Sequence, residues 1–255
     1  MDAFRAIACG VCFLVAATSG AVEAAPDDEA YALYRAGAYE AAAKRAVAAG
    51  GTDNLVLAAR ALNAAGYFDE DRKGARRLAG RALDHAEAAL EADPDNVEAH
   101  LQAGISLALR GANMAPVRAF FLGLPGRARR HIDRALALDP DNPWAWSTSA
   151  AWRLETARRG GGSVYGADPE EGFREFMKAR ALEPDNIAIA YECALRLLAS
   201  GRPEWRPAAL EALAAAMEGR PQTAFDAGVQ ARARLLSEAV AVGPDAEAAF
   251  LDAQP

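Results

Sequence analysis

The chain has 255 residues, of which 52% are hydrophobic and 25% charged, and its formal net charge is −7. This composition is typical of a soluble globular protein with one or two domains, and the acidic balance argues against nucleic acid or an anionic membrane surface as the main partner. Alanine dominates and only 7% of the residues are aromatic, which favours close-packed helices over strands. We therefore expect an all-α chain.

Residues 1–24 are predicted to be a cleaved signal peptide. Ala6 to Ala17 form an apolar run that is too short to span a membrane and is typical of a signal-peptide core. Small residues precede a cleavage point after Ala24. The basic region is weak because Asp2 opposes Arg5, so a buried N-terminal helix is the alternative. We expect a periplasmic or secreted protein with no integral membrane segment after cleavage.

The cysteines predict neither a lipid anchor nor a disulfide. Cys9 and Cys12 lie in the signal peptide, and neither has an aliphatic residue three positions earlier, as a lipoprotein signal requires. Removal of the signal leaves Cys193 alone, so no internal disulfide can form. A lone thiol at a helix-packing position favours a buried, inert side chain over a nucleophile.

Apolar periodicity predicts helices from the mature N-terminus onward. Residues 34–46 contain Gly-x-Tyr-x-x-Ala in Gly37, Tyr39 and Ala42, a turn followed by a helix. Residues 54–68 and 71–92 indicate the next helix and its long partner. Downstream, Asp/Glu-Pro-Asp-Asn occurs three times: each proline ends one helix, and Asn96, Asn142 and Asn186 can cap the next one.

The resulting unit of helix, turn and helix resembles the tetratricopeptide repeat (TPR). When Pro94, Pro140 and Pro184 are aligned, the small and bulky residues at the repeat's packing positions coincide. These positions hold Ala82, Ala89, Gly104, Ala128, Ala135, Trp146, Ala150, Ala179 and Ala194. The prolines are 46 and 44 residues apart, whereas the repeat has 34 residues, so each unit carries an insertion between its two helices.

The predicted fold class is therefore an all-α, TPR-like solenoid of helical hairpins over residues 25–242. We expect four to five hairpins up to residue 219. A C-terminal helix over residues 221–242 would cap the last apolar face, and residues 243–255 would form a tail.

The glycine-rich stretch of residues 157–173, ARRGGGSVYGADPEEGF, raises the possibility of a phosphate-binding loop. Such a loop usually follows a strand and, in the Walker form, carries a lysine. This stretch follows a predicted helix and lacks the lysine, and Asp168 to Glu171 form an acidic helix start that would repel an anion. A linker is the favoured interpretation.

No cofactor, metal site or catalytic constellation is indicated. His85, His100 and His131 are too scattered in the sequence to suggest metal ligands. The recurring aspartates of residues 93–95 and 139–141 are explained by turn chemistry. We therefore expect a protein that is not an enzyme.

The concave face is the better candidate site. In the TPR family this face is built from set positions of each first helix, and most of these positions are apolar here, which argues against a clamp for charged peptide tails. The predicted groove residues are Leu101, Ile105, Leu109, Trp144, Ala151, Leu154, Tyr191, Leu195 and Leu198.

Three explanations of this apolar surface stay open. The superhelix can close on itself or be filled by its capping helix, or the groove can receive an apolar peptide or an elongated ligand. Alternatively, the insert of residues 113–128 can cover the groove as a lid or plug. The predicted lid residues are Phe120, Phe121, Leu122 and Leu124.

Beyond the repeat itself, RALALDPDNPWAW, YGADPEEGF and KARALEPDN resemble two groups. One comprises bacterial periplasmic TPR proteins associated with TRAP-type transporters, and the other is the TPR-like domain of the regulator of microtubule dynamics family. The resemblance covers residues 97–201 and implies no catalytic residues.

We expect an exported, non-enzymatic adaptor or scaffold that binds a protein or peptide through its concave groove. The alternative is an accessory protein that holds a small hydrophobic ligand there. Homo-oligomerisation stays open, because the architecture alone does not choose a partner.

Overall fold

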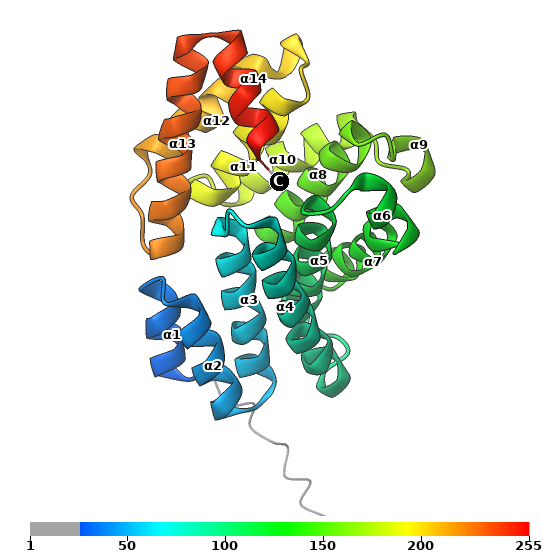
Figure 1. The fold of residues 1–255 in the computed structure, drawn as a ribbon, viewed down its shortest axis with the longest axis vertical. Coiled ribbons are helices and arrows are strands. Elements are labelled where there is room, and N and C mark those ends of the chain that lie inside the picture. The colour runs from blue at the N-terminus through cyan, green and yellow to red at the C-terminus, as the bar shows by residue number, and fades with distance from the viewer. Residues whose placement is uncertain (1–25, 255) are drawn as a thin grey trace, which may run out of the picture.

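The computed structural model describes residues 26–254 as a row of antiparallel helical hairpins, and no strand occurs in that range (Figure 1). The first helices of the hairpins are α1 (Asp28–Arg35), α3 (Thr52–Phe68), α5 (Val97–Ala112), α8 (Pro143–Arg158), α11 (Ile187–Ala199) and α13 (Ala224–Val242). Their partners are α2 (Tyr39–Ala49), α4 (Arg72–Ala92), α7 (Leu124–Leu138), α10 (Pro169–Leu182), α12 (Arg206–Glu218) and α14 (Pro244–Ala253). The all-α solenoid is confirmed. The predicted signal peptide lies outside the described residues.

The recurring asparagines start the first helices of three hairpins. The Oδ1 atoms of Asn96, Asn142 and Asn186 accept hydrogen bonds from the backbone N–H three residues later, at 2.9, 3.0 and 2.9 Å. Each such cap stabilises its helix by about 1 kcal/mol. The local chemistry of the repeated phrase thus sets where α5, α8 and α11 begin.

The extra residues of each repeat lie between its two helices. The first insertion contains α6 (Pro116–Phe121), the second contains α9 (Gly162–Tyr165), and a shorter one contains the 3-10 turn η1 (Pro203–Trp205). The insertions with α6 and α9 emerge at the same edge of the molecule, on the right in Figure 1. Phe120 of α6 and Tyr165 of α9 bring them into contact, with ring centroids 6.1 Å apart.

The predicted packing positions are occupied by small, buried residues. The seven alanines among them are at most 1% exposed, and buried Gly104 faces Ile132 of α7. Trp146 is half-buried instead: its indole N–H donates to the carbonyl oxygen of Pro140 at 2.7 Å, and the ammonium of Lys178 lies 4.0 Å from its ring. Small side chains at these positions allow neighbouring helices to approach closely.

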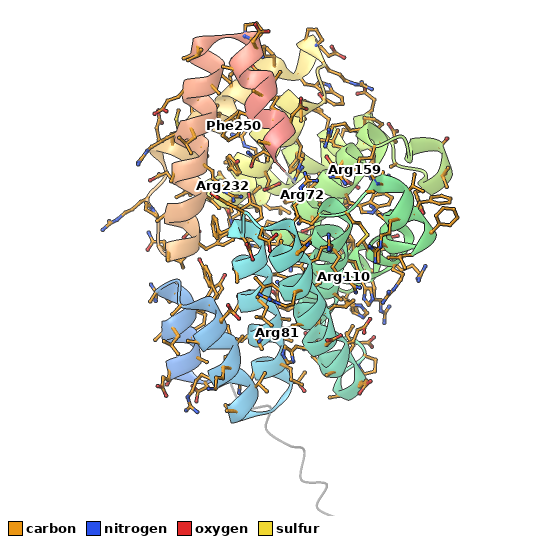
Figure 2. All side chains as sticks on the ribbon, in the orientation of Figure 1. Arg72, Arg81, Arg110, Arg159, Arg232 and Phe250 are labelled. Atoms are coloured by element: carbon orange, nitrogen blue, oxygen red, sulfur yellow. The ribbon has the colours of Figure 1, made fainter. Side chains whose placement is uncertain are left out.

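The row of hairpins closes on itself. The ring of Phe225, at the start of α13, lies 5.7 and 5.3 Å from the rings of Tyr67 and Phe68 at the end of α3. The Arg232 guanidinium, labelled in Figure 2, lies 4.7 and 5.0 Å from the centroids of the Tyr67 and Phe68 rings. These four residues, Tyr67, Phe68, Phe225 and Arg232, form what we call the seam. Closure of the superhelix, one of the three explanations of the apolar concave face, therefore occurs.

Residues 243–255, expected as a tail, contain α14, which packs back on α13 and α11. Gly243 turns the chain with φ 134°, and Pro244 starts the new helix. Glu247 accepts two hydrogen bonds of 2.8 Å from Arg206, and Phe250 contacts the core beside it (Figure 2). The Gly-Pro pair is a typical helix stop and start, so the sequence did contain a signal for a second helix here.

We expect Gly104→Ala to destabilise the protein, because a Cβ atom at this position would lie 2.9 Å from Cγ1 of buried Ile132. Overpacking of this kind lowers the free energy of unfolding by about 1–3 kcal/mol. Gly80→Ala on α4 is the matched control, since its Cβ would meet nothing within 4 Å and helix propensity then adds about 0.5–1 kcal/mol. Urea denaturation distinguishes the two variants, and equal shifts would contradict the packing role of Gly104.

Candidate binding cavity

The closed row of helices surrounds a half-open cavity of about 700 Å³. Its lining comes mainly from the first helices α3, α5, α8, α11 and α13 and from the two insertions that contain α6 and α9. The larger part of the wall is apolar and includes Leu101, Ile105, Ala108, Leu109, Trp144 and Ala151. A volume of this size can hold a small molecule or a few side chains of a partner.

The predicted groove residues divide into two sets. Leu101, Ile105, Leu109, Trp144 and Ala151 line the cavity. The remaining four, Leu154, Tyr191, Leu195 and Leu198, lie in the core, each at most 6% exposed. The prediction is wrong for this second set.

The position of α11 explains most of this difference. Helices α8, α12, α13 and α14 all contact α11, so it is enclosed on several sides and most of its apolar residues are core. The residues of α11 that do line the cavity are Ala188, Glu192 and Arg196, a stripe with i, i+4 spacing. The inner face of α11 is therefore rotated by about one residue from the position that the repeat pattern predicts.

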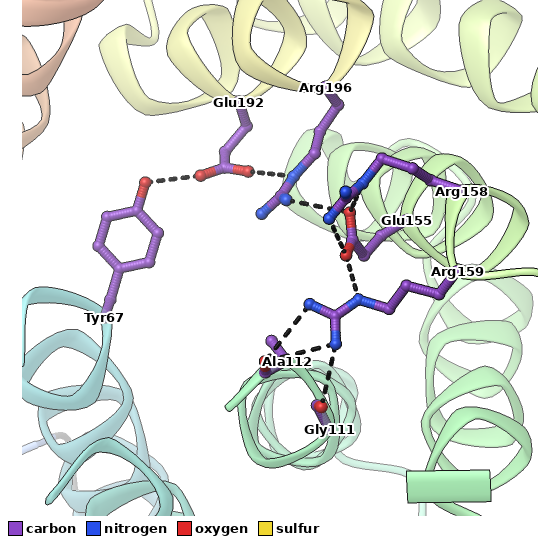
Figure 3. A network of polar contacts seen from close by, with 8 residues as sticks. All are labelled: Tyr67, Gly111, Ala112, Glu155, Arg158, Arg159, Glu192 and Arg196. Atoms are coloured by element: carbon purple, nitrogen blue, oxygen red, sulfur yellow. Dashed lines mark hydrogen bonds and ion pairs between the residues drawn. The ribbon is translucent and has the colours of Figure 1, made fainter. Parts of the chain in front are cut away.

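A chain of polar contacts crosses the cavity wall (Figure 3). The Tyr67 hydroxyl donates to Glu192 at 2.6 Å, and Arg196 donates from Nε to the other oxygen of Glu192 at 3.3 Å. Nη1 of Arg196 lies 3.5 Å from the carboxylate of Glu155, which also pairs with Arg159. We call these five residues the polar chain, and it connects α3, α11 and α8 with the loop that follows α8.

The polar chain ends on the backbone of α5. The Arg159 guanidinium donates to the carbonyl oxygens of Gly111 and Ala112 at 3.3 Å. These carbonyls belong to the last turn of the helix, where no intrahelical N–H is available to them. A cation at this end also interacts favourably with the helix dipole, so Arg159 holds the second insertion against the end of α5.

Charge compensation fixes the protonation states in the polar chain. Burial opposes ionisation of Glu155, but the hydrogen bond from Arg158 and the charges of Arg196 and Arg159 outweigh it and lower its pKa to about 2. Burial also disfavours the Arg196 cation, yet the charges of Glu192 and Glu155 outweigh it and raise the Arg196 pKa. Both side chains are therefore ionised at neutral pH.

A second polar cluster lies where α3 meets α5. Arg60 pairs with Glu98 at 2.6 Å, and Glu98 accepts a bond of 2.7 Å from Gln102, which in turn accepts one of 2.8 Å from Asn63. With the polar chain this places three arginines and three glutamates on the cavity lining. The formal charge of the lining is zero, so the cavity does not select strongly for an ionic ligand.

The predicted lid residues do not plug the cavity. Phe120 and Phe121 lie at its rim, and they and Leu122 are 49%, 81% and 48% exposed. Leu124 is 2% exposed and packs in the core with residues of α5 and α7. The insert therefore borders the opening and leaves the cavity accessible.

The glycine-rich stretch has the geometry of a linker. Gly160 and Gly166 have positive φ values of 83° and 65°, which glycine adopts without strain. Asp168 caps α10 by accepting a hydrogen bond from the backbone N–H of Glu170 at 2.9 Å.

Cys193 is fully buried, and burial raises the pKa of its thiol to about 12, so it stays protonated.

Two of the three histidines, separated by 31 residues, meet between α5 and α7. The Nδ1 atoms of His100 and His131 are 3.0 Å apart, and Nε2 of His100 lies 2.9 Å from the carbonyl oxygen of Pro94. Because a carbonyl can only accept, His100 carries a proton on Nε2, and a neutral His100 then accepts at Nδ1 from His131. The spacing of the two histidines in the sequence could not show this contact. No group of three or more His, Cys, Asp or Glu residues that could hold a metal ion occurs within residues 26–254.

We expect Glu155→Gln to lower stability in a pH-dependent manner. The folded-state pKa of Glu155, about 2, lies below its ordinary value of 4.5, so ionised Glu155 stabilises the fold above pH 4.5 and loses this effect as the pH falls toward 2. The shift corresponds to about 3 kcal/mol at neutral pH.

Denaturation of wild type and variant between pH 7 and pH 2 measures this difference. Glu171→Gln is the control, because Glu171 pairs with Arg174 on the solvent-facing side of α10 and such pairs contribute about 0.2–1 kcal/mol. A difference between wild type and Glu155→Gln that does not change with pH would contradict the assignment.

No helix within residues 26–254 is long and apolar enough to cross a lipid bilayer. Comparison with curated proteins finds no match to the chain. A family model described as regulator of microtubule dynamics protein 1-3 matches residues 25–241, which include every residue that lines the cavity; the C-terminal α14 lies beyond the match. This match covers most of the chain, and the chain therefore belongs to the regulator of microtubule dynamics family.

Proposed function

We propose that this chain is a non-enzymatic adaptor that binds a short apolar segment of a partner protein in its central cavity. The observation that carries the proposal is the cavity itself, because five predicted groove residues from α5 and α8 line it. Helical-repeat proteins bind partners on surfaces of this kind. The family match supports a helical protein-interaction domain.

The lining indicates which kind of segment would bind. Leucine, isoleucine and alanine side chains of α5 and α8 offer apolar contacts, and each buried aliphatic or aromatic side chain of a partner would contribute about 1.5–3 kcal/mol. The arginines and glutamates compensate one another, so they can accept or donate a few hydrogen bonds to a peptide backbone without requiring a charged residue. An apolar, uncharged segment fits best.

We expect Ala108→Trp to abolish partner binding. Ala108 lies on the cavity wall and is half-buried, so an indole there would fill space that the segment needs. A loss of 1.4 kcal/mol already lowers affinity about tenfold. Affinity capture from the native cells, with quantitative mass spectrometry, measures the recovery of each partner.

Leu210→Trp is the matched control, because Leu210 is 38% exposed on α12 and does not line the cavity. It should leave partner recovery unchanged, and circular dichroism should show that both variants fold. Equal recovery with Ala108→Trp and wild type would exclude the cavity as the binding site.

A small hydrophobic ligand is the second candidate occupant. The observation that favours it is closure of the superhelix by the seam, which turns an open groove into a cavity of about 700 Å³, within the usual range for small-molecule sites. Native mass spectrometry of protein purified from its own cells should then show an added apolar mass that Ala108→Trp removes. If no added mass is found, the small-ligand candidate is excluded and the peptide proposal is the one that remains.

We also propose that the protein is exported, as residues 1–24 predict. The apolar run of Ala6 to Ala17 and the small residues before Ala25 support this. The same mass measurement tests it, because the exported protein should begin at Ala25. Recovery of the chain with its first 24 residues intact would contradict export with cleavage.

A further inference from the structure

The rim of the cavity carries an exposed apolar surface that we call the apolar tip. It consists of Val117, Phe120, Phe121 and Leu122 around α6 and of Val164 on α9. Phe121, Val117 and Val164 are 81%, 67% and 62% exposed. Apolar side chains gathered in this way on a water-soluble domain mark an interaction site.

The apolar tip is firmly attached at its base. Ala119 is the buried residue of α6 and contacts the core below. Phe120 stacks edge-on against Phe121 and Tyr165, with centroids 5.9 and 6.1 Å away. Since Val117, Phe120 and Phe121 have i, i+3, i+4 spacing, they share one face of the helix. The tip thus presents a preformed, exposed apolar face at the rim of the cavity.

Positive charge surrounds this face. Residues 113–138 contain five arginines and one aspartate; Arg127, Arg129 and Arg134 pair with Glu87, Asp133 and Asp95, so the uncompensated positive charge comes from the other two arginines. Arg118 and Arg130 are exposed, and neither has an ion-pair partner among residues 26–254. The Arg130 guanidinium reaches back to Gly126, beside the ring of Tyr165, so it lies at the base of the tip.

We propose that the apolar tip docks into the surface of a lipid bilayer that contains anionic lipids. Short apolar faces with phenylalanine and leucine, flanked by arginine, insert at the boundary between headgroups and acyl chains, and the cations attract anionic headgroups. Five side chains are too few for a stable protein interface, which needs about 800 Å² per partner. A bilayer needs no complementary shape and can accommodate a small exposed apolar face.

The total charge of the chain does not oppose this docking. Electrostatic interactions with a membrane decay within about 10 Å at ordinary salt concentrations. The charges around the tip, and not the net charge of the chain, therefore determine whether docking is electrostatically favourable. Docking goes beyond the proposed adaptor function, because it depends on the exposed side chains at the rim and not on the occupant of the cavity. The two proposals can fail independently.

The test measures partitioning of the chain, purified from its native cells, onto vesicles by sedimentation. The vesicles contain equal parts of phosphatidylcholine and phosphatidylserine, or phosphatidylcholine alone. We expect wild type to bind the mixed vesicles. Phe121→Asp should lower this binding about tenfold or more, because it removes an aromatic side chain that would be buried in the bilayer. Arg118→Gln should lower binding about fivefold, because one cation near the surface is removed. Both residues are exposed, so both variants should unfold at the wild-type temperature.

Val242→Asp is the matched control, because Val242 is 80% exposed at the end of α13, away from the cavity. It should bind like wild type. All variants are purified from the native cells in the same way, so residues 1–24 are removed or retained equally in each of them. Equal binding of Phe121→Asp and Val242→Asp to the mixed vesicles would overturn the proposal, as would equal binding of wild type to both kinds of vesicle.

A second copy of the chain is the competing occupant of the tip. Light scattering after gel filtration, in the absence of vesicles, gives the mass of wild type and Phe121→Asp. We expect the same mass for both. A wild-type dimer that Phe121→Asp converts into a monomer would overturn membrane docking in favour of self-association.

Discussion

The constraint on which the structure depends is the need of a helical solenoid to cover its terminal apolar faces. Here α13 meets that need by bending back to the end of α3, where Phe225 contacts Tyr67 and Phe68. Closure at this seam turns a concave groove into a cavity. It also encloses α11, which then carries apolar core residues on several faces and arginine and glutamate on the face toward the cavity.

Much of the fold could be predicted because it is encoded locally. The asparagine caps, the stopping prolines and the small packing residues act within one hairpin, so a repeated phrase was enough to place α5, α8 and α11 and the insertions between partners. The candidate site was predicted only in part. Leu101, Ile105 and Trp144 line the cavity, whereas Tyr191 and Leu195 lie in the core, because α11 is enclosed by α8, α12, α13 and α14 together.

The features that could not be predicted depend on contacts between residues that are far apart in the sequence. Tyr67 and Glu192 are 125 residues apart, and His100 and His131 are 31 apart, and neither pair has a sequence signature. The charge distribution was equally hidden: a chain with an acidic total has a basic segment around α6 and α7. Net charge describes the chain as a whole, whereas a partner interacts only with the charges that lie within about one Debye length of the contact.

The polar chain contributes specificity as well as stability to the cavity. Desolvation of Arg196 and Glu155 offsets much of their attraction, and apolar residues of similar volume could stabilise such a site as well. Directional bonds through Glu192 and Glu155 connect α3, α11 and α8 at defined distances of 2.6, 3.3 and 3.5 Å between polar atoms. We infer that these bonds fix the relative positions of the helices around the cavity, because replacement of one partner would leave the other charge buried without compensation.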